Sequence, residues 1–121
     1  MTLFVLMFLA HCIDDFCLQG VCLVNMKQKS WWEKNTNNPK YKNDYIISLL
    51  IHAFEWSAVI NIVMIIFGVS NEFLACSFII NGLIHALVDD LKANKLKINL
   101  IQDQTIHIVQ IIVTVLLYYY A

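Results

Sequence analysis

Histidine and carboxylate side chains recur four residues apart within stretches of the sequence that are otherwise apolar. Three such pairs occur, each in a different stretch: His11 with Asp15, His85 with Asp89, and Asp103 with His107. An α-helix has 3.6 residues per turn, so a separation of four places both side chains of a pair on one face. Imidazole nitrogens and carboxylate oxygens together are ligands for zinc, manganese and iron. The pattern therefore indicates a metal site.

The fourth histidine, His52, has Glu55 three residues after it. Each of four apolar stretches thus contributes one histidine with a carboxylate within about one helical turn. Counted from the lysine-rich ends of the stretches, these groups lie at similar depths, which predicts one polar layer inside a bundle. The predicted metal ligands are His11, Asp15, His52, His85, Asp89, Asp103 and His107, and the predicted catalytic bases are Glu55 and Asp14.

The apolar stretches that carry these residues are long enough to cross a membrane. They cover residues 3–25, 45–68, 73–91 and 98–117, and the whole 121-residue chain is 60% hydrophobic. About 20 apolar residues in a helix span a hydrocarbon core of about 30 Å. A soluble bundle would show polar residues at every turn, whereas these stretches are interrupted only at isolated points. We therefore predict an all-α integral membrane bundle of about four transmembrane helices, with residues 1–121 forming a single domain.

The lysines predict the orientation of the bundle. All eight basic residues are lysines, and they lie only in residues 27–42 and 92–97. The positive-inside rule places both lysine segments in the cytoplasm and both termini outside, as expected for a multi-pass protein of the inner (plasma) membrane. Trp31, Trp32 and the tyrosines 118–120 suit the two membrane interfaces. The expected partner is the lipid bilayer and not nucleic acid, and a homo-oligomer is left open.

The order of the motifs resembles that of a known family. The runs HCIDDFCLQ from residue 11, HALVDDLK from residue 85 and DQTIH from residue 103 are similar to motifs of domain of unknown function family 3307. The resemblance covers nearly the whole chain and implies a small bacterial or phage polytopic membrane protein, without implying a substrate. A looser resemblance is to membrane-bound metal-dependent hydrolases, which also carry HxxxD motifs in apolar helices.

Several functions fit this pattern. The preferred one is a metal-dependent hydrolase at the cytoplasmic membrane face, in which zinc or manganese activates water and polarises a phosphoryl or acyl oxygen. One alternative is a non-enzymatic transporter, pore or effector that uses the same groups as a proton or cation path. Another is a bundle that binds a b-type haem through two facing histidines. A purely structural role, in which the polar groups hydrogen bond helices together, is the fourth interpretation.

Overall fold

The protein is an all-α bundle. The computed structural model describes residues 1–120, and these contain no β-strand. The elements are α1 (Thr2–Ile13), a π-helical turn η1 (Asp14–Leu18), α2 (Gly20–Met26), α3 (Lys29–Asn35), a 3-10 turn η2 (Pro39–Tyr41), α4 (Asp44–Ile66), α5 (Asn71–Ala93) and α6 (Leu100–Tyr120). The predicted fold class is confirmed. Ala121, which was expected outside the membrane with the rest of the C-terminus, lies outside the described residues.

The long helices have the length and composition of membrane spans. Among the described residues, α4, α5 and α6 each meet these criteria, and the bent pair formed by α1–η1 and α2 gives a fourth span if it is counted as one. The bundle buries more polar or charged residues than apolar ones, whereas isoleucine and leucine cover its outer faces. This distribution is the reverse of that in a soluble protein, and it suits a hydrocarbon surrounding.

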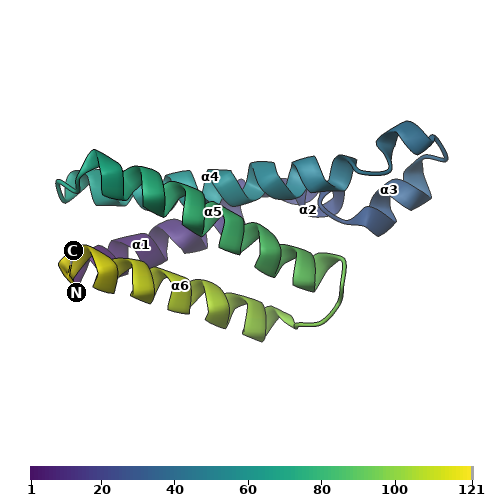
Figure 1. Ribbon diagram of the computed structural model, residues 1–121. Coiled ribbons are helices and arrows are strands. Elements are labelled where there is room, and N and C mark those ends of the chain that lie inside the picture. Colours follow the sequence, from purple (N-terminus) through teal and green to yellow (C-terminus); the bar gives the residue numbers. More distant parts are fainter. Residues whose placement is uncertain (121) are drawn as a thin grey trace.

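The helices are arranged so that both lysine segments lie at one end of the bundle. Figure 1 shows α4 and α5 as an antiparallel hairpin, with α6 returning toward the N-terminus, so that both chain ends lie together. The α3 region and the turn between α5 and α6 lie at the opposite end. The α4–α5 pair is closely packed, because a Cβ built on Gly82 would come within 2.7 Å of the Phe54 ring.

The first apolar stretch is broken where a continuous span was expected. The chain bends by 87° between the segment that ends at Leu18 and the helix that begins at Gly20. Gly20 has a φ of 60°, a left-handed conformation that glycine adopts without steric cost. The wide turn just before it carries Asp14 and Asp15. Such π-helical turns interrupt regular helices, frequently at functional sites.

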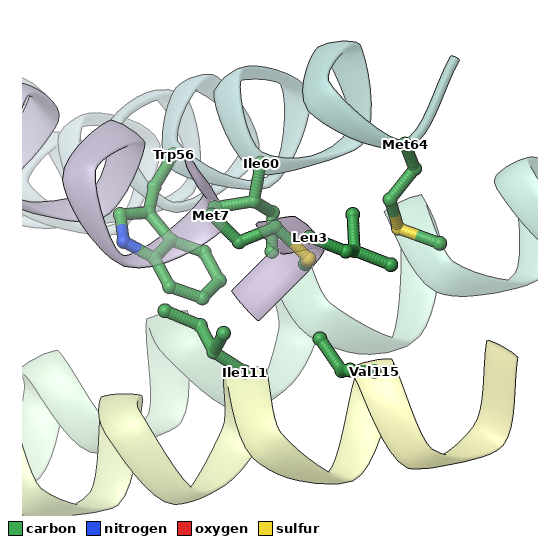
Figure 2. Packing of buried hydrophobic residues seen from close by; sticks show 7 residues of the cluster. All are labelled: Leu3, Met7, Trp56, Ile60, Met64, Ile111 and Val115. Carbon is green, nitrogen blue, oxygen red and sulfur yellow. The ribbon is translucent and has the colours of Figure 1, made fainter. Parts of the chain in front are cut away.

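An apolar cluster lies between α1, α4 and α6 in the half of the bundle next to the termini. Figure 2 shows side chains from α1, α4 and α6 meeting there, namely Leu3, Met7, Trp56, Ile60, Met64, Ile111 and Val115. Six of these seven residues are fully buried. Trp56 lies at the edge of this cluster, and its ring is also in contact with histidines. The interior beyond Trp56, toward the lysine end, is polar.

Candidate metal centre

The histidines of all four apolar stretches meet inside the bundle. His11, His52, His85 and His107 are each no more than 1% exposed. They come from α1, α4, α5 and α6, and their rings lie close to one another inside the bundle. Asp89 lies among them and is 3% exposed.

The contacts around Asp89 have the spacing of ligands on one metal ion. The Nε2 atoms of His52 and His85 are 3.2 Å apart, and His52 Nε2 lies 3.5 Å from Asp89 Oδ2. Asp89 Oδ1 lies 3.8 Å from His85 Nε2 and 3.6 Å from His107 Nε2. Two ligand atoms, each about 2.1 Å from an ion at a tetrahedral angle, are about 3.4 Å apart. The observed separations lie on both sides of that value.

Two overlapping sets of side chains could hold a metal. Asp15, His52 and His85 form one set, and His85, Asp89 and His107 form the other, with the ligand atoms in each set within 4.8 Å of one another. His85 belongs to both. Asp15 joins through its Oδ1 atom, which lies 3.7 Å from His52 Nε2. The two sets therefore describe one continuous cluster.

Several atoms that face this cluster have no hydrogen-bond partner among the described residues. They include His107 Nε2, Asp15 Oδ1 and Asp103 Oδ1, all of which are buried. Burying such atoms without a partner costs free energy. His107 Nε2 and Asp103 Oδ1 lie 3.4 Å apart, and an imidazole nitrogen and carboxylate oxygens are the donor set that a transition metal accepts. The residues present therefore fit a metal ion.

The charges in the cluster also favour a divalent cation. Four carboxylates are inside the bundle, those of Asp14, Asp15, Asp89 and Asp103. Two ammonium groups pair with them: Lys27 Nζ lies 2.6 Å from Asp89 Oδ2, and Lys92 Nζ lies 2.7 Å from Asp103 Oδ2. The carboxylates of the cluster thus outnumber its ammonium groups. A divalent cation would add positive charge beside them, and uncompensated charge is costly in a low dielectric.

The geometry of His11 differs from that expected of a ligand. The indole Nε1 of Trp56 donates a hydrogen bond to His11 Nδ1 at 2.8 Å, so this nitrogen is an acceptor and the ring proton is on Nε2. That Nε2 lies 3.1 Å from Gln104 Oε1 and donates to it. Both ring nitrogens are thus engaged by protein groups. Gln104 in turn donates to Asp15 Oδ2 at 2.9 Å, so His11 positions Asp15 through Gln104.

The two predicted bases lie in different surroundings. Asp14 is fully buried, and its Oδ2 lies 3.8 Å from His52 Nδ1, on the opposite side of the imidazole from the Nε2 that faces the cluster. Neither Asp14 oxygen nor His52 Nδ1 forms a hydrogen bond among the described residues, so the carboxylate faces the imidazole without bonding to it. Glu55 is half-buried, and it forms no hydrogen bond or ion pair with the described residues.

Comparison with known proteins identifies the family. The family described as protein of unknown function (DUF3307) matches residues 3–121. The chain belongs to this family. No curated protein and no solved structure matches the chain. Membership in DUF3307 supplies no reaction, so the chemistry of this member has to come from its own side chains.

Four residues of this DUF3307 protein that contact the cluster were not predicted from the sequence as part of it: Lys27, Trp56, Lys92 and Gln104. Gln104 was present within the DQTIH motif, and Trp56 lies four residues after His52 on the same helix face, so a local signal existed for both. Lys27 and Lys92 were assigned to solvated cytoplasmic segments. Their pairing with Asp89 and Asp103 depends on the tertiary structure, because nothing in the local pattern distinguishes them from the other lysines.

Proposed function

We propose that this protein binds a divalent transition metal, zinc or manganese, inside the membrane and uses it to hydrolyse a substrate at the cytoplasmic membrane face. The observation that carries the proposal is the convergence of imidazole and carboxylate ligand atoms from different helices at separations of 3.2–3.8 Å. The ligands in this proposal are the members of the two sets, Asp15, His52, His85, Asp89 and His107. Asp103, which was also predicted as a ligand, pairs with Lys92 beside them. The excess of carboxylates over ammonium groups in the cluster supports the same assignment.

The surrounding residues hold the ligands in place. Lys27 pairs with Asp89 Oδ2, which leaves Oδ1 directed at His85 and His107. A hydrogen-bonded contact of the kind that Lys27 makes fixes the orientation of a ligand group and raises metal affinity.

The hydrolytic step needs a Lewis acid and a base. A bound metal would supply polarisation of the acyl or phosphoryl oxygen and would activate water. Glu55 takes the role of base in the proposal, because it lies three residues after the ligand His52 on α4 and its carboxylate is half-buried. Hydrolysis adds the hydroxyl of water to the acyl or phosphoryl centre, and the proton returns to the oxygen of the leaving group.

Two features favour this function over the alternatives. The His85 and His107 rings stack with centroids 4.0 Å apart and planes inclined by 22°, which leaves no room for a porphyrin between them. Beyond Trp56, toward the termini, Leu3, Met7 and Ile60 pack between α1, α4 and α6, which favours a closed site over an ion path between these three helices.

The proposal is tested with purified protein in detergent. Hydrolysis of fluorogenic acyl esters and phosphate esters in mixed micelles is measured before chelation, after chelation, and after zinc or manganese is restored. We expect activity that depends on the metal and that is lost, together with metal content, in Asp89→Asn. Asp44→Asn, at the start of α4, is the matched control. Hydrolysis that survives complete removal of metal would contradict the proposal.

A further inference from the structure

A small cavity lies at the lysine end of the protein, between α3 and the 3-10 turn η2. Its volume is about 210 Å³, below the range of about 300–1,000 Å³ that is usual for drug-sized ligands, so it suits a smaller group. The side chains that line it combine aromatic, charged, amide and hydroxyl groups, and they include Trp32, Glu33, Thr36, Asn38, Tyr41 and Lys42. The cavity shares no residue with the two sets of metal ligands.

Two of the lining residues are aromatic. The rings of Trp32 and Tyr41 are nearly parallel, with centroids 6.2 Å apart and planes inclined by 15°. The Trp32 ring is fixed in place, because its Nε1 donates a hydrogen bond to the Met26 carbonyl oxygen at 2.7 Å. The faces of tryptophan and tyrosine rings attract an ammonium group that lies within about 6 Å of the ring centroid. The aromatic pair therefore favours a ligand with a positively charged nitrogen.

The two charged residues that line the cavity have opposite signs. The Glu33 carboxylate lies 3.8 Å from Lys29 Nζ, but these side chains are 65% and 45% exposed, so the ion pair between them is weak. The carboxylate can therefore accept a hydrogen bond from an ammonium group of a ligand. Lys42 is exposed, and a lysine ammonium group binds phosphate oxygens. Together, these groups fit a zwitterion that carries an ammonium group and a phosphate.

The loop that joins α3 to η2 is ordered by its own hydrogen bonds. The backbone N–H of Asn38 donates to Thr36 Oγ1 at 3.2 Å, and Asn38 Oδ1 accepts from the Lys40 backbone nitrogen at 3.0 Å. Pro39 follows at the start of η2 and fixes the backbone there. A ligand would thus bind without first ordering this loop, which lowers the free-energy cost of binding.

The position of the cavity next to a span indicates the source of the ligand. The helix α4 has 23 residues and is therefore about 34 Å long, close to the hydrocarbon thickness of about 30 Å. Tyr41 and Lys42 precede its first residue, Asp44, by three and two positions. Figure 1 shows α3 at the same end of the bundle, beyond the start of α4. Because headgroups add about 5–7 Å on each side of the hydrocarbon, the cavity lies at the depth of lipid headgroups.

We propose that this cavity binds the phosphoethanolamine headgroup of a membrane phospholipid. The ammonium group contacts the Trp32 and Tyr41 rings and pairs with Glu33, and the phosphate pairs with Lys42. A headgroup that has a phosphate but no ammonium group can make only the contact with Lys42, so the site discriminates between lipids by their headgroups. The inference goes beyond the proposed function and does not depend on a bound metal.

The experiment uses the full chain in detergent, and native mass spectrometry measures the binding of dioleoyl phosphatidylethanolamine and dioleoyl phosphatidylglycerol. These lipids share their acyl chains and phosphate, and only the first carries an ammonium group. We expect the wild type to prefer the ethanolamine lipid. Glu33→Gln and Tyr41→Leu should each lower its affinity by about two- to fivefold and leave that for the glycerol lipid nearly unchanged. Glu72→Gln and Tyr119→Leu, which remove the same groups at the opposite end of the bundle, are the matched controls and should change neither affinity.

Three results would overturn the inference. Equal affinity for the two lipids, or a preference for the glycerol lipid, would mean that the lysines attract phosphate without selecting the headgroup. An unchanged preference in Glu33→Gln would separate the preference from the cavity, and this variant decides even if Tyr41→Leu does not fold, because Glu33 is exposed. Soluble phosphoethanolamine is added as a competitor, and displacement of the lipid by an equimolar amount would assign the site to the free headgroup and not to the membrane.

Discussion

The indole ring of Trp56 stacks on the imidazole of His85, with ring centroids 4.4 Å apart and planes inclined by 23°. Trp56 is fully buried, and its Nε1 donates to His11. One side chain therefore contacts both a residue shared by the two ligand sets and the hydrogen-bonded chain that positions Asp15. The apolar cluster and the histidine cluster are linked at this residue.

Replacing this indole should affect both clusters. We expect Trp56→Phe to leave His11 Nδ1 buried without a donor, at a cost of about 1–3 kcal/mol in the free energy of unfolding. Because Asp15 loses part of its support, metal affinity should fall by about 10–100-fold. Trp32→Phe is the control, since it also removes an indole hydrogen bond, to the Met26 carbonyl, but lies outside the cluster. Equal metal affinity in both variants would argue against the link.

The buried Lys27–Asp89 pair predicts a difference between the metal-free and metal-bound protein. Lys27→Met removes the ammonium group and leaves Asp89 uncompensated, which should lower the stability of the chelated protein by about 3–5 kcal/mol. With metal restored, the loss should be smaller, because the cation supplies positive charge. Thermal unfolding with and without chelator measures both. Lys29→Met, which removes an exposed pair with Glu33, should change stability little in either state.

The local periodicity of helices explains which parts of the site were predictable. The four-residue spacing predicted that His11 and Asp15, and likewise Asp103 and His107, share a face, and these pairs lie 3.7 and 3.4 Å apart. The break at Gly20 was not predictable in this way, because the apolar pattern continues across it. The hydrogen bond from Trp56 to His11 was equally unpredictable, because it joins residues that are 45 positions apart in the sequence.

Because α4 and α5 approach closely at Gly82, even a methyl side chain at this position should destabilise the bundle. In Gly82→Ala the new Cβ would lie 2.7 Å from the Phe54 ring, so the helices or the ring must shift, at a cost of about 1–3 kcal/mol. Phe54→Leu should relieve the clash, and the double variant should be more stable than the sum of the single effects predicts. If chemical unfolding showed that the stability effects of the two substitutions are strictly additive, the contact between Gly82 and Phe54 would not limit the packing of α4 against α5.

The orientation of the bundle predicts where labels react. In a variant whose native cysteines are replaced by alanine, Lys95→Cys and Ser70→Cys lie at opposite ends of α5. We expect an impermeant maleimide added to intact cells to label position 70 and not position 95, because lysine-rich segments stay in the cytoplasm. Labelling of position 95 alone would mean that the orientation is inverted.

The metal content of wild-type protein and of His85→Ala tests the central claim most directly. His85 belongs to both ligand sets, so its loss should remove the metal from either arrangement. Elemental analysis of protein purified in zinc- or manganese-supplemented buffer should find about one ion per chain or per dimer in the wild type, as expected for a site closed by a few protein ligands, and almost none in His85→Ala. A metal-free wild type, or full metal retention in both His85→Ala and His107→Ala, would contradict the account.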